Sequence, residues 1–270
     1  MHFIVAFLLA FAWAGAAGAI DDDDLAVVLA GQSHRYTRSD LEHKLAIHTL
    51  TVADPDHDAP VRYDAFALTD LLALAGVAAS HGDELVFVAR DGYAPTVAYA
   101  ALAINEAFIA FREHGNPKGF ELVKQGKAWV SPAPYFLVWR AGKSLSAEFP
   151  WPYQLIRIEV VDFATKYAAL YPRGVLPDEV ELRGFRTYKT HCLRCHSINL
   201  QGGELGPELN VPKNVTEYWD GAHLRAFIYD ASAYHAHSKM PAFAGALSAT
   251  EMDDLLAYLA LMKTRKISTP

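Results

Sequence analysis

The segment His191–His196, which reads His-Cys-Leu-Arg-Cys-His, constrains this chain more than any other feature. It holds both cysteines of the 270-residue sequence. A C-x-x-C-H pattern predicts covalent attachment of a c-type haem, with one thioether bond from each of Cys192 and Cys195. The adjacent His196 is then expected to be an axial ligand of the iron. Because no cysteine is left over, the sequence predicts a single haem c and no structural disulfide.

Two other chemistries use closely spaced cysteines. A thioredoxin-like redox pair would begin a helix within a βαβ unit. A four-cysteine zinc site would need a second pair, which the chain lacks. A mixed zinc site remains open, formed by Cys192, Cys195, His196 and either His191 or a more distant histidine. The residues that follow the motif favour haem over both alternatives.

Three features follow the motif in a fixed order. They are Gly206-Pro207-Glu208-Leu209, then Met240-Pro241-Ala242-Phe243, and then an apolar helix expected over residues 248–262. With the C-x-x-C-H segment, this order resembles a class I cytochrome c domain covering residues 178–265. The resemblance implies an all-α domain that transfers electrons.

The same resemblance assigns roles to three further residues. The carbonyl of Pro207 would orient His196 from behind. Leu209 would pack on the haem face, and the sulfur of Met240 would be the second axial ligand. His235 and His237 are alternative ligands that would make the haem bis-histidine and lower its potential. Otherwise they are loop residues near the haem edge.

Helical periodicity supports this placement. In class I cytochromes a small residue on the first helix contacts an aromatic residue on the last, and Gly184 and Tyr258 match that pair. Ser248 is a favourable N-cap residue, and Glu251 three positions later would complete a capping box. The apolar stripe of the last helix is expected to pack in the core.

The chain length suggests two domains. Residues 3–20 are almost wholly apolar and end with Ala17-Gly18-Ala19. This predicts a secretory signal over residues 1–19 with cleavage near Ala19. The alternative is an uncleaved membrane anchor, because about 18 apolar residues are marginally long enough to span a bilayer. Since c-type haem is attached outside the cytoplasm, we expect a periplasmic protein.

Residues 25–165 are expected to form a mixed α/β domain, which gives the chain an α+β class. The pattern predicts a helix over residues 64–77 that stops at Gly76. Residues 166–177, rich in Pro and Gly, are expected to be a short semi-rigid linker. Strands are predicted over residues 84–89, 96–99, 107–112, 136–139 and 155–161.

This order of elements resembles a small version of the sulfite-oxidase-type molybdopterin-binding fold. Such enzymes usually hold molybdenum with a cysteine thiolate, and this chain has no cysteine before Cys192. Molybdopterin is therefore not an expected cofactor, and a docking role is favoured for the domain. The residues that carry the resemblance are Leu71–Val77, Val86–Val88, Asp91–Tyr93, Phe136–Trp139 and Tyr153–Ile156. Fused cytochromes of this kind also resemble the chain in Asn214–Trp219.

Other polar groups in the first domain are weaker candidates. Histidines and aspartates lie close together in the sequence between residues 43 and 58, and imidazole and carboxylate together can hold zinc, copper or iron. Residues 54–60 also have the composition of an exposed turn. The segment Asp91-Gly92-Tyr93 predicts a tight turn rather than a catalytic group. The histidines and acids of the possible metal site are His43, His48, His57, Asp54, Asp56 and Asp58.

The charge distribution is uneven. Residues 21–165 contain 20 Asp or Glu against 12 Lys or Arg, whereas residues 166–270 contain 11 against 12. No basic patch for nucleic acid is present, and contact with a membrane is expected only if the N-terminal segment stays uncleaved. The leading hypothesis is a periplasmic carrier of single electrons between redox partner proteins, which the first domain would help to dock.

Two alternatives remain. The chain could be an oxidoreductase whose first domain binds a metal or pterin and acts on a small molecule such as a sulfur oxyanion. It could also be a redox or gas sensor, which requires a labile sixth iron ligand. The sequence favours an electron-transfer protein over a catalyst.

Overall fold

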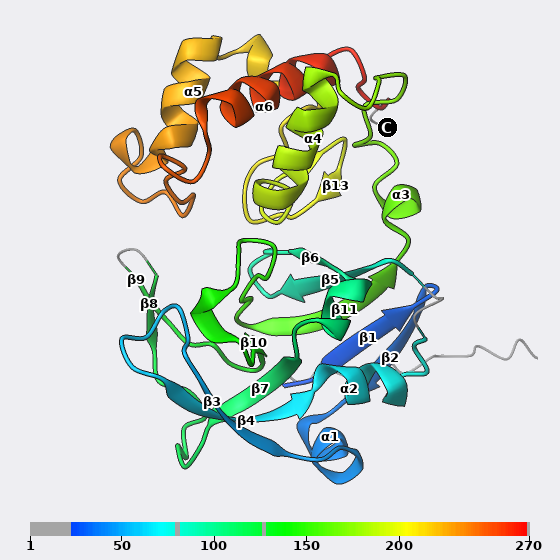
Figure 1. Ribbon diagram of the computed structural model, residues 1–270, viewed down its shortest axis with the longest axis vertical. Coiled ribbons are helices and arrows are strands. Elements are labelled where there is room, and N and C mark those ends of the chain that lie inside the picture. The colour runs from blue at the N-terminus through cyan, green and yellow to red at the C-terminus, as the bar shows by residue number, and fades with distance from the viewer. Residues whose placement is uncertain (1–22, 79–81, 126–127, 269–270) are drawn as a thin grey trace, which may run out of the picture.

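The computed structural model describes residues 23–78, 82–125 and 128–268. They form two lobes, one above the other, connected through the short helix α3 (Phe163–Lys166) (Figure 1). The proposed signal segment, residues 1–19, lies outside the described residues. Within the described ranges, no helix combines the length and the apolar character that a membrane span requires.

The first lobe contains two main sheets. The five-stranded sheet has the order β2-β1-β11-β5-β6, in which only β1 and β11 are parallel. The four-stranded sheet has the order β10-β7-β4-β3 and is antiparallel. The strands of the first sheet are β1 (Leu25–Leu29), β2 (Gln32–Tyr36), β5 (Glu84–Ala89), β6 (Thr96–Ala98) and β11 (Leu155–Val161). Those of the second are β3 (His48–Val52), β4 (Val61–Ala67), β7 (Ala107–Glu113) and β10 (Phe136–Trp139).

Smaller elements complete this lobe. A hairpin of β8 (Val123–Gln125) and β9 (Ala128–Val130) stands apart from the two sheets. Helix α1 (Arg38–Lys44) begins at Thr37, whose side chain forms a capping box with Asp40. Helix α2 (Leu68–Leu74) follows strand β4 directly. Short 3-10 turns cover Tyr99–Ala103 (η2) and Gly142–Ser144 (η3).

The four-stranded sheet is buried on both faces. Along β7, Ile109 and Phe111 join one apolar cluster, which the two sheets share, whereas Phe108 and Ala110 join a second cluster on the opposite face. Side chains alternate between the faces of a strand, so burial of both faces produces a continuous apolar run. This explains why the strand is easy to recognise from its sequence.

The predicted helix over residues 64–77 is wrong in its first part. Residues up to Ala67 belong to β4, and the helix begins only at Leu68. Strand β4 pairs with β3 on one side and β7 on the other, and its Tyr63 and Phe66 face opposite clusters. Sheet pairing therefore overrides the local helical pattern. The predicted stop is confirmed, because Gly76 has a φ of +75° directly after the helix.

The other predicted strands are confirmed, with boundaries that differ by one residue at most. The sequence made no assignment for residues 25–52, which hold β1, β2 and β3. The mixed α+β class is also confirmed.

The second lobe is helical. Its main helices are α4 (Val180–His191), α5 (Gly221–Tyr229) and α6 (Ala249–Met262). It also contains the two-residue strands β12 (Ser197–Ile198) and β13 (Gln201–Gly202), so it is not strictly all-α. Two 3-10 turns cover Val215–Glu217 (η4) and Ala231–Ala233 (η5). The expected capping box of Ser248 and Glu251 begins α6.

Helices α4 and α6 pack closely at Gly184. A Cβ atom there would collide with the carbonyl oxygen of Asp254 and lie 2.8 Å from the Cβ of Tyr258. The expected contact between Gly184 and Tyr258 is thus present. Arg183 adds a bidentate ion pair to Asp254, at 2.7 and 2.8 Å. We call the apolar cluster around these helices the C-terminal cluster. Its main members are Leu182, Phe185, Tyr188, Leu193, Leu224, Ile228, Phe243, Met252, Leu255, Tyr258, Leu259 and Met262.

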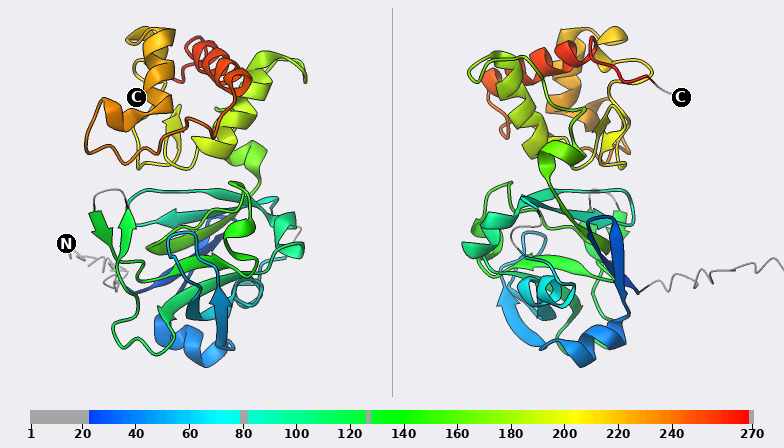
Figure 2. Two further views of the ribbon diagram at one scale, coloured as in Figure 1. Left: turned by 60° about the vertical axis from the view of Figure 1, so that its left-hand side comes forward. Right: turned by 90° about the vertical axis from the view of Figure 1, so that its right-hand side faces the viewer.

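Strand β5 lies at the boundary between the two lobes (Figures 1 and 2). Leu85 and Phe87 face the cluster shared by the two sheets, whereas Val86 belongs to the C-terminal cluster and Val88 packs against it. Tyr167 and Leu170, in the segment expected to be a linker, are also buried in the C-terminal cluster. The connection between the lobes is therefore packed along part of its length.

Polar contacts reinforce this interface. Lys189 on α4 forms an ion pair with the buried Glu84 of β5 at 2.5 Å. The backbone N–H of Ala94 donates to the carbonyl of Arg194 at 2.8 Å, and that of Glu204 donates to Gly92 at 2.8 Å. Two of these contacts reach the segment around the cysteines, so the first lobe lies directly against the candidate site.

Candidate haem-binding site

The cysteine motif forms the turn that ends helix α4. Cys192 is the C-cap residue, and its N–H donates to Tyr188. The N–H groups of Cys195 and His196 both donate to the carbonyl of Cys192, at 3.0 and 2.8 Å. One helical turn therefore holds the two sulfurs and the imidazole in sequence. This compact turn explains why the spacing C-x-x-C-H works as a unit.

A single hydrogen bond fixes the orientation of His196. Its Nδ1 lies 2.8 Å from the carbonyl oxygen of Pro207. Because a carbonyl can only accept, Nδ1 carries the proton and the lone pair lies on Nε2. Burial lowers the pKa of His196, although the Pro207 bond acts in the opposite direction. The neutral ring with a free Nε2 is the form that ligates a metal.

Gly206 allows this close approach. Its N–H donates to the carbonyl of Cys195 at 2.7 Å, so the loop crosses directly over the histidine. A Cβ atom at this position would lie 2.5 Å from Cε1 and 2.7 Å from Nδ1 of His196. Only glycine therefore fits between the loop and the ring.

Both thiols are free and partly buried. Burial raises the pKa of Cys192 to about 12 and that of Cys195 to about 11. A redox dithiol needs a stabilised thiolate, and the motif ends a helix instead of beginning one. The thioredoxin-like alternative is therefore not supported. Among the described residues, no group of three His, Cys, Asp or Glu side chains is placed to bind a metal ion.

Leu209 and Met240 are both partly buried against the C-terminal cluster. The Met240 segment lies beside the end of α4, because the ring of Phe243 contacts that of His191 edge-on at a centroid distance of 5.9 Å. Next to Met240, Lys239 lies 4.0 Å from Asp91 of the first lobe. His235 and His237 are exposed, and His235 lies edge-on to Phe227 at 5.7 Å.

A chain of buried amides supports the loop after His196, and sequence reasoning did not identify it as a unit. Asn210 donates to Asn199 at 2.8 Å, and Asn214 donates to Asn210 at 2.7 Å. Asn214 also reaches the carbonyl of Leu259 on α6, and Asn199 reaches that of Ala169. The one sequence signal for it is the resemblance of Asn214–Trp219 to fused cytochromes.

Glu208 has a similar supporting role. One of its carboxylate oxygens accepts from the N–H groups of Asn199, Asn210 and Val211, at 2.9, 2.8 and 3.1 Å. The other accepts from Leu200 at 2.9 Å. The carboxylate therefore binds the two ends of the loop that carries Pro207, which keeps the acceptor of His196 in place.

The donor set fits a haem of the c type. It offers two thiols, a neutral imidazole with its Nε2 free and apolar surroundings, and Met240, the expected second ligand, is partly buried against the same cluster. When bound, a haem supplies a one-electron couple at its iron. The protein contributes the orientation of His196 and a largely apolar environment, both of which tune such a centre.

In the part of the chain that the structure describes, His43, His48 and His57 do not gather into a metal site. His43 contacts the backbone oxygen of Ser39 at 2.6 Å, and His48 packs edge-on against Phe108. His57 lies 3.4 Å from the buried Asp54. Each ring thus has a separate local environment.

The aspartates near His57 have structural partners. Asp54 accepts from the hydroxyl of Tyr63 at 2.6 Å, and Asp56 accepts from the hydroxyl of Tyr153. The turn expected at Asp91-Gly92-Tyr93 is present, with a φ of +87° at Gly92 and a bond from the Tyr93 N–H to Asp91 at 3.1 Å.

Comparison with known proteins agrees with this geometry. Residues 180–259 match the family model of cytochrome c oxidase, cbb3-type, subunit III. Cytochrome c of Theileria parva is 29% identical over 106 residues, covering 33% of this chain and 90% of that protein. Cytochrome c of Theileria annulata matches with the same identity and coverage. The C-terminal lobe of this chain is therefore a cytochrome c-type domain, which implies that it binds haem c and transfers electrons.

Proposed function

We propose that the protein carries single electrons through one haem c. Cys192 and Cys195 hold the haem covalently, and His196 and Met240 are the axial ligands. The observation that carries this proposal is the bond between His196 Nδ1 and Pro207, which leaves Nε2 free in a ring that cannot turn. The position of Met240, partly buried beside the end of α4, supports its role.

This ligand set favours a carrier over a catalyst. With His196 and Met240 both bound, the iron keeps no open position for a substrate or a gas. Methionine ligation also raises the potential of a c-type haem above that of a bis-histidine haem.

In this proposal the first lobe is a small sulfite-oxidase-type domain that docks redox partners. Its excess of acidic residues would steer a partner with a basic surface. The protein reaches the periplasm through a signal over residues 1–19. The absence of a cysteine before Cys192 argues against a molybdenum centre in this lobe.

The ligand assignment is tested with a matched pair of variants. Met240→Leu and Met252→Leu make the same change, the second in the buried core of α6. We expect Met240→Leu to lose the methionine-to-ferric charge-transfer band and to lower the reduction potential, while Met252→Leu keeps both. An unchanged Met240→Leu spectrum, with a changed spectrum in His235→Ala or His237→Ala, would overturn the assignment.

The cofactor content tests the docking role. Haem-loaded protein purified from a periplasm should contain one iron per chain, and denaturing mass spectrometry should show the haem still attached. No second metal and no pterin are expected. A second metal or a pterin near one equivalent would overturn the carrier proposal and favour an oxidoreductase.

A further inference from the structure

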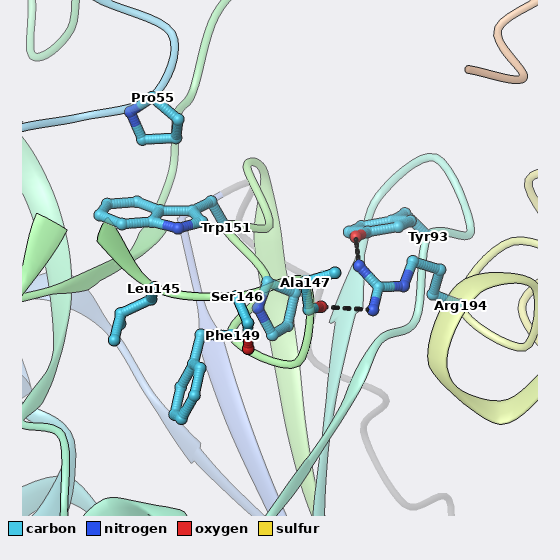
Figure 3. Close-up of a pocket in the computed structure, with 9 residues that line it drawn as sticks. Pro55, Tyr93, Leu145, Ser146, Ala147, Phe149, Trp151 and Arg194 are labelled. Atoms are coloured by element: carbon cyan, nitrogen blue, oxygen red, sulfur yellow. Dashed lines mark hydrogen bonds between the residues drawn. The ribbon is translucent and has the colours of Figure 1, made fainter. Parts of the chain in front are cut away.

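A cavity of about 340 Å³ lies where the first lobe meets the cysteine motif. Pro55, Leu145, Phe149 and Trp151 give it an apolar wall, and Tyr93 and Arg194 give it a polar end. Figure 3 shows Arg194 reaching from the C-terminal domain toward Tyr93, with Trp151 lying beneath Pro55. The cavity therefore combines side chains from both lobes, and its one cation sits between the two haem-attaching cysteines.

The guanidinium of Arg194 is held by the backbone instead of by an acid. Its Nη2 donates to the carbonyl of Ala147 at 2.8 Å and to that of Thr190 at 2.5 Å. Its Nη1 reaches the hydroxyl of Tyr93 only at 3.4 Å, and its Nε has no partner. Among the residues that the structure describes, no carboxylate lies within ion-pair distance of Arg194, and the neighbouring Asp91 lies next to Lys239.

The side chain of Arg194 retains the capacity to bind an anionic group. Its charge is permanent, and a guanidinium presents a flat fork that suits a carboxylate. Here the carbonyls of Ala147 and Thr190 orient the fork but leave the charge uncompensated. An anion that accepted from Nη1 and from the Tyr93 hydroxyl would supply the missing charge.

We propose that this cavity binds a small organic anion with a flat apolar body. The anionic group would contact Arg194 and Tyr93, and the body would lie against Trp151 and Phe149. The volume is at the lower end of small-molecule sites, which span about 300–1,000 Å³. An inorganic ion would satisfy the arginine but leave the aromatic wall in water, so the wall selects for an organic ligand.

The position of the site gives it a consequence for electron transfer. Arg194 is two residues from His196, so a bound anion would place a negative charge beside the haem. Such a charge favours the ferric state and lowers the reduction potential. This consequence rests on the proposed function, whereas binding itself does not.

The binding test uses benzoate as the anionic probe and benzamide as a neutral probe of nearly the same shape. Calorimetric titration of the full haem-loaded chain should show benzoate binding at least tenfold more tightly than benzamide. Arg194→Gln should weaken benzoate binding at least tenfold. Arg186→Gln is the matched control, because Arg186 lies on α4, before the cysteine motif, and donates to the carbonyl of Pro177 outside the cavity.

A second variant tests the same site in case Arg194→Gln misfolds. Ser146 lines the cavity and is exposed, so Ser146→Glu places a carboxylate beside Arg194 without removing its backbone bonds. This variant should abolish benzoate binding while keeping the wild-type circular dichroism. Equal binding of benzoate and benzamide, or unchanged benzoate binding in both Arg194→Gln and Ser146→Glu, would overturn the site.

The coupling to the haem has its own readout. Saturating benzoate should lower the reduction potential of the wild type and of Arg186→Gln, but not that of Arg194→Gln. Benzoate binding with no change in potential would overturn the coupling. A chain that fails to attach haem would instead overturn the proposed function, and calorimetry on that chain would still test the site.

Discussion

Replacing Gly206 with alanine tests whether the loop over His196 controls the haem ligand. The new Cβ would lie 2.5 Å from Cε1, 2.7 Å from Nδ1 and 2.9 Å from Nε2 of the ring. Relaxed carbon contacts are about 3.5–4.0 Å, so the ring and the loop must separate by about 1 Å. The bond from Nδ1 to Pro207, now 2.8 Å, would then exceed the usual limit of about 3.2 Å.

The expected cost follows from these two effects. Overpacking of a tight contact costs about 1–3 kcal/mol, and the lost hydrogen bond adds about 1 kcal/mol. Gly206→Ala should therefore lower the free energy of unfolding by about 2–4 kcal/mol. Because the imidazole also loses its fixed orientation, the haem spectrum and the reduction potential should change as well.

The assay is urea unfolding of the haem-loaded protein, followed by haem absorbance and by circular dichroism. Gly221→Ala is the control, because no atom lies within 4 Å of its Cβ position and its φ is not left-handed. It should be neutral within about 0.5 kcal/mol. Wild-type stability and an unaltered spectrum in Gly206→Ala would refute the argument that glycine is required there.

Two further predictions concern the first lobe and the interface. Burial opposes ionisation of Asp64, but hydrogen bonds from Thr49, Arg112 and His114 lower its pKa overall. The ionised carboxylate therefore stabilises the fold above its ordinary pKa of about 3.9, and this stabilisation is lost as the pH falls through the depressed value. The stability advantage of wild type over Asp64→Asn should be full at pH 7 and vanish in acid. A pH-independent difference in stability would contradict this. Val86→Asp buries a carboxylate in the C-terminal cluster. In this variant, haem absorbance and tryptophan fluorescence should report separate unfolding transitions, whereas in wild type the two transitions should coincide. Coincident transitions in both proteins would argue against a structural role for the contact between Val86 and this cluster.

The fold was predictable where one physical effect dominates. Strands β5, β7, β10 and β11 are apolar on both faces or flanked by clear turn residues, so they stand out in the sequence. Strands β1 to β3 were not assigned. Strand β2 has mostly polar or exposed residues, and its place depends on pairing with β1. The end of strand β4 has a helical pattern, and its pairing with β3 and β7 is not visible in that local pattern.

The site was predictable to the extent that it is local. The motif at Cys192–His196 and its neighbour Pro207 lie within a short stretch, and the structure brings them together. The supporting chain of Asn199, Asn210 and Asn214 was not visible, because single buried asparagines have no periodicity. The place of Arg194 in the cavity could not be predicted either, since its partners Tyr93 and Ala147 come from the other lobe.

Strand β5 is buried on both faces, and each face packs in the core of a different lobe, so the stability of each lobe depends on the other. Leu85 and Phe87 need the core of the first lobe, and Val86 and Val88 need the C-terminal cluster. Separating the lobes would expose these valines and break the ion pair between Glu84 and Lys189. The same strand leads into the turn whose Ala94 N–H binds the carbonyl of Arg194. The first lobe and the cysteine motif are therefore in direct contact, which is why the two lobes must be tested as one molecule.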